Sequence, residues 1–223
     1  MYENKFDKIL YSHQLWLHNQ EGGERANLEG ADLRGAKLSG ANLACANLKG
    51  TNLSGANLTC ANLADAILRG ADFSDAILRG ADISDACLDN AVFLRTDFSR
   101  AHLCLSTVRP CYYPSDKPAI IERCNFRGAY LSRLDWSVAE IKRCDFENAY
   151  ISNCIFEGTK FTEGCNFEEV FFDECVLNGT NFSGANLRNA RLAYARLVNA
   201  NLVGANLQGT NLKHAVISSA VFS

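Results

Sequence analysis

Residues 26–50 read ANLEG ADLRG AKLSG ANLAC ANLKG, five copies of one five-residue unit. From Leu28 to Leu103 an apolar residue stands at every fifth position, and Ala stands two residues before it except at Thr51 and Thr96. A helix would carry these leucines around its surface, because five residues turn it by about 500°. A straight strand would send successive leucines to opposite faces. The period therefore predicts a chain that bends once per repeat.

Such a bend gives each repeat two inward and three outward positions. The central Leu or Phe and the small residue two before it point inward, and the frequent Gly suits the corner. A single unit cannot bury its apolar residue, so successive turns have to stack at about the 4.8 Å spacing of hydrogen-bonded strands. The sequence therefore predicts an all-β solenoid.

The repeated Ala-Asp/Asn-Leu-x-Gly pattern, as in residues 31–35, resembles the pentapeptide-repeat family, including its bacterial members. This resemblance implies a right-handed quadrilateral β-helix with four repeats, about 20 residues, in each coil. The pattern resumes at Phe126 and, after one extra residue near Gly164, continues to Phe222. We expect about 9–10 coils in all, with Val108 and Ile121 as partial repeats.

We expect one single domain built from four segments. Its segments are an N-terminal helical cap (1–25), the first four coils (26–105), a Pro-containing side loop (106–123) and the continuing coils (124–223). The cap helix is predicted within residues 4–21, with Asn4 as the N-cap and Gly22 and Gly23 as the stop. Its apolar face would contain Phe6, Ile9, Leu10, His13 and Leu17.

Composition and charge limit the classes of protein to which this chain can belong. The chain of 223 residues has a net charge of −3 and no secretory signal or apolar run long enough to span a bilayer. Its ten cysteines form no C-x-x-C pair, which is typical of reduced thiols. We therefore expect a cytoplasmic protein without a membrane segment.

The cysteines raise two alternatives. Stacked coils would align Cys124, Cys144 and Cys165 in one inward column, and Cys154 and Cys175 in another. Thiolates bind zinc, but cysteine also replaces alanine as a small buried residue. A column along one wall offers poor tetrahedral geometry, so the sequence favours packing.

A second group of metal-ligand types surrounds the loop. It comprises His102, Cys104, Cys111 and Cys124. Their spacing matches no standard zinc knuckle, and the alternatives are a zinc site, a Cys104–Cys111 disulfide or free thiols, which we favour. The remaining histidines, His13, His18 and His214, are expected to be solvated. We expect neither a metal nor a cofactor.

Catalysis needs a concave pocket with an activated nucleophile or a paired acid and base. A narrow solenoid filled with Leu, Phe and Ala offers no such cavity, and no nucleophile elbow, phosphate loop or zinc-protease motif occurs. The sequence predicts that the protein is not an enzyme and that its outer surface does the work.

Charge is unevenly placed on that surface. Eight acids and one base lie between Asp145 and Glu174, whereas Arg123 to Arg143 carries five bases. Some relatives, the quinolone-resistance proteins and a mycobacterial counterpart, resemble DNA in shape and charge and bind type II topoisomerases. The resemblance therefore implies one alternative function, a DNA-mimicking modulator of DNA gyrase or topoisomerase.

Stacking argues against a uniform acidic surface. Arg127, Glu147, Glu168 and Arg188 should share one outward column, and Arg143 should lie next to Glu163, so opposite charges offset one another. We favour a non-catalytic scaffold for an unidentified protein partner and expect no direct nucleic-acid binding. The candidate interaction residues are Glu163, Glu168, Glu169, Asp173, Glu174 and Phe222.

The C-terminal coil suggests a homodimer. The coil carrying Ile217 and Phe222 is followed by no cap in this sequence. Unpaired strand edges and uncovered apolar side chains favour association. Some members of the family that the chain resembles pair through their C-termini, so we expect a possible symmetric dimer through Phe222.

Overall fold

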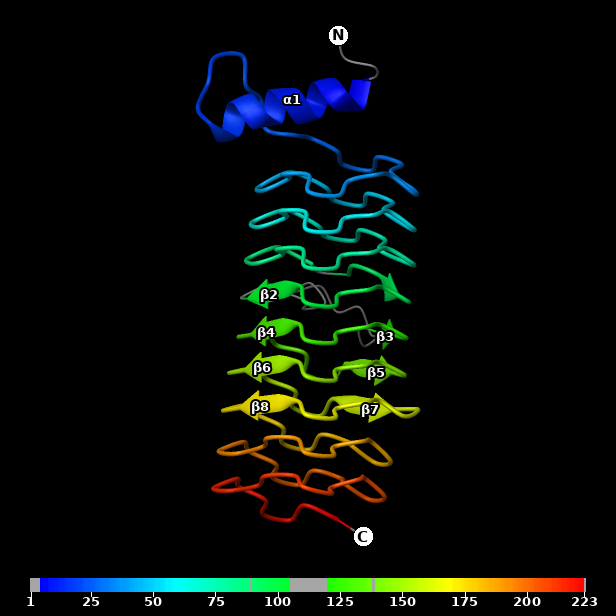
Figure 1. Ribbon diagram of the computed structural model, residues 1–223, viewed down its shortest axis with the longest axis vertical. Helices are drawn as coiled ribbons and strands as arrows, with labels where there is room; N and C mark the ends of the chain where they lie inside the picture. The colour runs from blue at the N-terminus through cyan, green and yellow to red at the C-terminus, as the bar shows by residue number, and fades with distance from the viewer. Residues whose placement is uncertain (1–4, 89, 105–119, 138, 223) are drawn as a thin grey trace.

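The computed structural model describes residues 5–88, 90–104, 120–137 and 139–222. The chain winds as a right-handed β-helix, and helix α1 (Lys5–Leu17) lies across its N-terminal end (Figure 1). Two parallel four-stranded sheets run along opposite sides of the rod. One contains β1 (Phe93–Leu94), β3 (Ile120–Glu122), β5 (Glu140–Lys142) and β7 (Lys160–Thr162); the other contains β2 (His102–Cys104), β4 (Tyr130–Ser132), β6 (Tyr150–Ser152) and β8 (Phe171–Asp173).

The register follows the predicted coil length. Parallel bridges join residues 20 apart, as Asn27 to Asn47, and residues 21 apart across Gly164, as Asp145 to Asn166. One outward column crosses ten rungs, which confirms the prediction of 9–10 coils; it contains residues 32, 52, 72, 92, 120, 140, 160, 181, 201 and 221.

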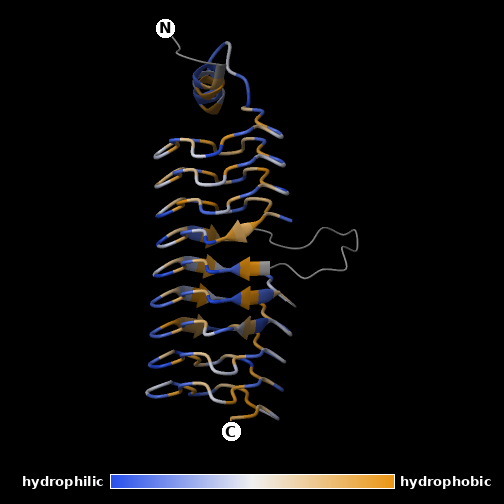
Figure 2. Ribbon diagram, turned by 90° about the vertical axis from the view of Figure 1, so that its right-hand side faces the viewer, coloured by the Kyte–Doolittle hydropathy of each residue, from blue (hydrophilic) through white to orange (hydrophobic). Residues whose placement is uncertain are grey.

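Inward and outward positions are also as predicted. Leu53 and Ala56 are fully buried, and hydrophobic and hydrophilic residues alternate along each rung (Figure 2). The threonines that replace alanine are buried with their hydroxyls satisfied: Thr51 donates to the Leu28 carbonyl at 2.8 Å and Thr96 to the Phe73 carbonyl at 2.9 Å. Threonine at these two positions therefore leaves no buried polar group without a hydrogen bond.

The outward positions next to the core residue shape the corners. The Asn or Asp before the central residue accepts a hydrogen bond from the amide two residues on, as Asn52 does from Ser54 at 3.0 Å. This turn explains the preference for Asn and Asp, which the period alone did not. The fifth position adopts the left-handed backbone whether it is glycine, as Gly30 (φ 65°), or not, as Asp65 (φ 57°).

A column of stacked phenylalanines fills the core of the middle coils. The ring centroids of Phe126 and Phe146 are 4.8 Å apart, and those of Phe146 and Phe167 are 4.9 Å apart. Phe98 extends the column at 5.0 Å from Phe126. Residues 20 or 21 apart thus stack their rings in one inward column, and each ring adds stacking to its burial.

The predicted loop ends earlier than expected. Ile120–Glu122 forms strand β3, and Ile121 is buried and pairs with Phe93, so residues 120–123 belong to a coil. Ile121, which the sequence predicted as a partial repeat, occupies the inward position of this coil. Residues 105–119, including Val108 and all three prolines, lie outside the described residues.

Helix α1 forms where the sequence predicts it, and Phe6, Ile9 and Leu10 pack against the first coil. Asn4 lies outside the described residues. His13 corrects the prediction of a solvated histidine, because its side chain is fully buried. Its Nδ1 accepts a hydrogen bond from the Ala26 amide at 3.2 Å, and its ring stacks on Trp16. His13, on the apolar face of α1, thus contributes to the packing of the helix against the solenoid.

The helix also ends earlier than the predicted stop at Gly22 and Gly23. Asn19 adopts a left-handed φ of 53° directly after the last turn. The Gln20 amide donates to the Leu15 carbonyl at 2.8 Å and the Asn19 amide to the Trp16 carbonyl at 3.0 Å. These bonds form a Schellman motif with Asn in the position that glycine usually takes.

The buried histidine predicts a pH-dependent cap. Burial, reinforced by the positive charge of Arg25, lowers the pKa of His13 below its ordinary 6.5. The unfolded cap therefore takes up a proton at a higher pH than the folded cap, and the free energy of unfolding falls as the pH drops below about 6.5. The hydrogen-exchange protection factors of the α1 amides, which correct for the slower intrinsic exchange at low pH, should fall between pH 7 and 5 in the wild type.

His18 is the matched control, because it is exposed and its Nδ1 lies 2.7 Å from the Gln14 carbonyl within the helix. His13→Gln should remove the pH dependence, whereas His18→Gln should keep it. Equal pH dependence in both variants would show that His13 is not the group responsible.

Candidate interaction surface

The acidic candidates are distributed around the rod. Glu163 follows β7 on one side, Asp173 ends β8 on the opposite side, and Glu168 and Glu169 lie in the turn before β8. Glu174 follows β8. The structure therefore does not bring the five acids together on one face.

Three of these acids are paired with arginines on neighbouring rungs. Glu163 lies 2.7 Å from Arg143, and Glu168 lies 2.9 Å from Arg188. Asp173 lies 4.0 Å from Arg191. The predicted offset of charges between rungs is confirmed, although such exposed pairs contribute only about 0.2–1 kcal/mol each.

The predicted offset of charges also holds two rungs earlier in the column of Glu168 and Arg188. Arg127 donates to both carboxylate oxygens of Glu147, at 2.5 and 2.6 Å, and reaches Asp145 at 3.1 Å. Glu169 and Glu174, in contrast, have no ion pair within the described part of the chain. These two carboxylates stand in the turns on either side of β8.

Four aromatic rings stack on the outer surface of the sheet that contains β8. They are His102, Tyr130, Tyr150 and Phe171, one from each strand of β2, β4, β6 and β8, and we call them the aromatic ladder. Their successive centroids are 4.8, 5.1 and 4.6 Å apart, with planes within 14° of parallel. Tyr130 and Tyr150 are 44% and 46% exposed. Sequence reasoning missed this surface.

Charged groups bound the aromatic ladder. Arg100 precedes β2 and Arg133 follows β4, and neither guanidinium has an ion pair among the described residues. At the other end the unpaired Glu169 and Glu174 flank Phe171, whose ring is covered by the Arg191 guanidinium at 4.9 Å. The face is therefore positive at its N-terminal end and negative at its C-terminal end, with exposed rings between.

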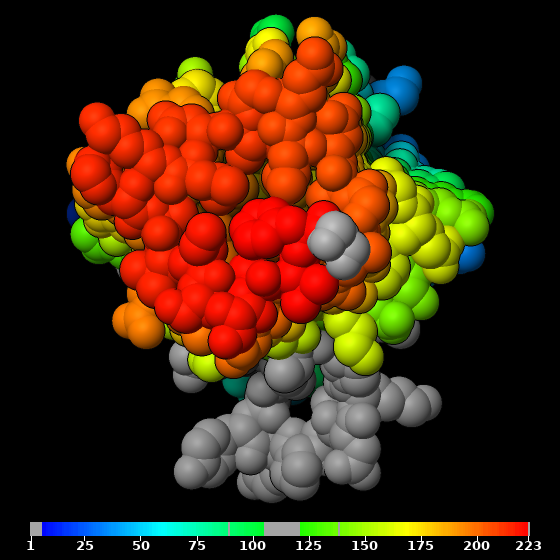
Figure 3. Space-filling model, turned by 90° about the horizontal axis from the view of Figure 1, so that it is seen from below, coloured from blue at the N-terminus to red at the C-terminus, as the bar shows by residue number. Residues whose placement is uncertain are grey.

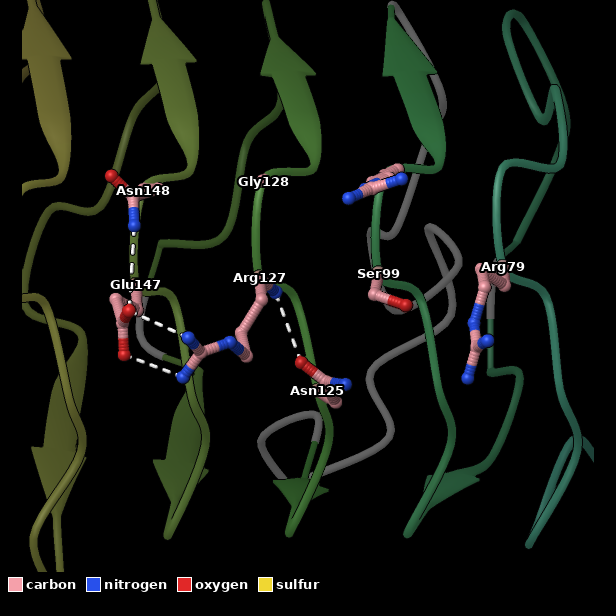
Figure 4. A pocket seen from close by; sticks show the side chains of 8 residues that line it. Arg79, Ser99, Asn125, Arg127, Gly128, Glu147 and Asn148 are labelled. Carbon is pink, nitrogen blue, oxygen red and sulfur yellow. Dashed lines mark hydrogen bonds and ion pairs between the residues drawn. The ribbon is translucent and has the colours of Figure 1, made fainter.

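A groove with a volume of about 450 Å³ lies on the adjacent side of the rod (Figure 4). Ser99 stands between Arg79, one rung before it, and Arg127, one rung after it. We call this hollow the arginine groove and define it by Arg79, Ser99, Arg100, Arg127 and Glu147. It exists because a short serine separates two long side chains.

The buried cysteines behave as core residues. Both predicted columns are present: Cys124, Cys144 and Cys165 are buried in one, and Cys154 and Cys175 in the other. Burial raises the pKa of Cys165 to about 11, so its thiol remains protonated at neutral pH. Its sulfur donates to the Ile141 carbonyl at 3.4 Å. Buried thiols with carbonyl partners, as at Cys165, fit packing better than metal binding.

Metal binding has no support in the described ranges, where no three His, Cys, Asp or Glu side chains lie close enough to hold one ion. Cys111 lies outside those ranges, so the alternatives that involve it, a zinc site or a Cys104–Cys111 disulfide, stay untested.

Phe222 lies at the C-terminal end of the rod, onto which Figure 3 looks. Its ring is 38% exposed, beside Ile217 at 43% and Val221 at 49%. It is far along the rod from the aromatic ladder, and pairing of two copies through it stays a prediction.

These observations define the class of protein: a four-sided β-helix built from five-residue repeats, with its distinctive side chains on the outside. The family described as pentapeptide repeats matches the chain in eight copies, over residues 24–59, 56–93, 119–162, 163–192 and 195–223. The chain belongs to the pentapeptide-repeat family.

Solved structures of the family are similar over most of the chain. HetL from the cyanobacterium Nostoc sp. strain PCC 7120, a protein involved in heterocyst differentiation regulation, is 25% identical, with 99% of this chain and 97% of HetL covered and a TM-score of 0.40. QnrB1, a plasmid-mediated fluoroquinolone resistance protein, is 18% identical, with 84% and 85% covered and a TM-score of 0.58. The likeness to QnrB1 shows the fold alone.

A search of curated proteins by sequence found no match. Within the described residues, no helix has the length and apolar character needed to cross a membrane.

Proposed function

We propose that the protein is a non-catalytic scaffold that binds a protein partner along the aromatic ladder. The observation that carries this proposal is the row of stacked rings of Tyr130, Tyr150 and Phe171 on one sheet face, in which the two tyrosines are exposed. Exposed aromatic residues gathered on one face are typical of interaction sites, where they supply apolar area at a small entropic cost. A rigid repeat scaffold presents such a row without reorganisation.

The shape of the ladder favours a protein partner over a sugar. A sugar ring packs on the face of an aromatic ring, but Tyr130 and Tyr150 have neighbouring rings on both of their faces. Only ring edges and the tyrosine hydroxyls point outward. Ring edges and hydroxyls suit a side-chain surface that offers both apolar contact and hydrogen bonds.

The charges at the two ends specify the partner further. A segment that lies along the ladder would meet Arg100 and Arg133 at one end and Glu169 and Glu174 at the other. We infer a segment with apolar residues in its middle, acidic residues toward the arginines and basic residues toward the glutamates. A nucleic acid fits this face poorly, because its phosphates would meet the two glutamates.

The alternative, a topoisomerase modulator that imitates DNA, lacks a comparable observation. Three of the acids that would represent phosphates, Glu163, Glu168 and Asp173, are paired with arginines. A DNA-supercoiling assay with gyrase tests this alternative directly. Inhibition that persists after the aromatic ladder is removed would favour it over our proposal.

The proposal predicts that one double substitution abolishes partner binding. Tyr130→Ser with Tyr150→Ser should lower the recovery of the partner from the native host at least tenfold, because hot-spot aromatics carry much of the binding energy. The measurement is quantitative affinity capture of the full-length variants. Circular dichroism should be unchanged, since both tyrosines are about half exposed.

Ile155→Ser with Val216→Ser is the matched control. These residues are 37% and 45% exposed and lie in an outward column on another side of the rod. The control should recover the partner as well as the wild type does. Equal recovery by both double variants, or loss in both, would contradict binding along the aromatic ladder.

A further inference from the structure

The arginine groove lies on the side of the rod next to the aromatic ladder and shares Arg100 with its edge, but it has a chemistry of its own. Asp97 pairs in register with Ile77 on one side and Asn125 on the other. The side chains two residues later, Arg79, Ser99 and Arg127, are therefore on successive rungs (Figure 4). Two rungs, about 9.6 Å, separate the backbones that carry the two arginines.

The hydroxyl of Ser99, at the floor of the groove, is a donor that no described residue uses. At the same position in other repeats the serine hydroxyl donates to the preceding Asp, as Ser74 does to Asp72 and Ser84 to Asp82, both at 2.6 Å. The amide of Ser99 donates to Asp97 at 3.0 Å in the same way. Its hydroxyl makes no hydrogen bond to any described residue, so it is available to a ligand.

The three guanidinium groups differ in how firmly they are held. Arg127 is fixed by both oxygens of Glu147. Arg79 meets Asp97 only at 3.4 Å, and its side chain is 62% exposed. Arg100 has no ion pair among the described residues, and its stem lies 3.7 Å from where a Cβ on Gly128 would stand. Figure 4 shows the Arg127 guanidinium turned away from Ser99 towards Glu147, so the loosely held Arg79 and the free Arg100 are the cations left for a ligand beside Ser99.

We propose that the arginine groove binds a phosphate group. A tetrahedral oxyanion presents several oxygens, each of which can accept a charge-assisted hydrogen bond from a different direction. It can accept from Arg79, from the Ser99 hydroxyl and from Arg100, all of which line the groove, whereas Arg127 is held by Glu147. A phosphate monoester carries a charge of about −1.5 to −2 and three oxygens, which suits several convergent donors better than a planar carboxylate does.

The surrounding acids select for an isolated phosphate. Glu147 and Glu168 follow Arg127 in the same outward column, one and two rungs further along the rod. A nucleic-acid backbone that continued along this column would place its next phosphates against those carboxylates. The site therefore suits a single phosphate, either inorganic or carried as a monoester on a small molecule or side chain.

Thermal unfolding and calorimetry of the full chain test this proposal. Inorganic phosphate at pH 7.5 should raise the Tm, and chloride at the same ionic strength should not, because only phosphate has the fitting geometry. Arg100→Gln should weaken phosphate binding at least tenfold. This variant breaks no ion pair seen in the structure, so its folded state serves as the reference.

Arg133→Gln is the matched control, since Arg133 is also an unpaired exposed arginine but lies outside the groove. It should bind phosphate as the wild type does. A peptide containing phosphoserine distinguishes the sources: tighter binding than inorganic phosphate points to a phosphorylated protein, and equal binding points to a free phosphate or small monoester.

Three results would overturn the proposal. The first is stabilisation by chloride equal to that by phosphate, and the second is the same loss of binding in Arg100→Gln and Arg133→Gln. The third is tighter binding of a single-stranded oligonucleotide than of phosphoserine, because the proposed site excludes a continuous phosphate chain.

Discussion

Leu53→Asp is expected to abolish the folded state at room temperature. Leu53 is completely buried in an apolar column, one rung from Leu33 and from Phe73. A carboxylate there has no partner, and burying an unpaired charge costs several kcal/mol or forces protonation. That cost is comparable to the whole stability of a typical domain, about 5–15 kcal/mol. Circular dichroism should show loss of the β signal or aggregation.

Ser54→Asp provides the control one residue away. Ser54 points outward, and its hydroxyl donates to the Asn52 side chain at 2.7 Å. Loss of this partly exposed bond should cost at most about 1 kcal/mol, so the Tm should change by only a few degrees. A Leu53→Asp protein that melts like the wild type would refute the assignment of inward and outward positions.

Phe146→Ala is expected to have the next largest effect, a loss of about 3–5 kcal/mol of stability. Phe146 is fully buried at the centre of the aromatic column. It stacks on Phe126 and Phe167, and the edges of Trp136 and Phe161 contact it at 6.4 and 6.1 Å between centroids. Truncation leaves a cavity that rigid neighbouring rungs cannot close, and it removes two stacked pairs.

Urea unfolding measures this loss, with Phe222→Ala as the comparison. Phe222 has the same chemistry but is 38% exposed at the end of the rod, so its truncation should cost about 1 kcal/mol or less in the monomer. Similar losses in the two variants would show that the central rungs are no better packed than the terminal one.

Much of the fold follows from the period. Five-residue spacing excludes a helix and a straight strand, and it identifies inward residues such as Leu53 and Phe146 before any coordinates are known. The 20-residue coil length came from the family resemblance, and with it the columns of Phe126 and Cys124 could be aligned correctly. His13 could not be assigned in this way, because a helix that packs on a solenoid follows no repeat.

The candidate site was harder to predict. Tyr130, Tyr150 and Phe171 are 20 and 21 residues apart, so the coil length places them in one outward column. Charge alone does not reveal this column, because none of the three side chains is charged at neutral pH. The acids chosen by charge lie on different sides of the rod and are mostly neutralised by arginines.

By itself, the sequence of this protein determined which side chains are buried, because a bend every five residues leaves only one arrangement that hides the leucines. The tertiary structure decided which outward side chains meet. His102 pairs with Tyr130, 28 residues away instead of 20, because the next described strand begins only at Ile120, and no period predicts the number of residues between Cys104 and that strand. The aromatic ladder and the arginine groove both depend on this interval, since Ser99 and Arg127 also lie on opposite sides of it.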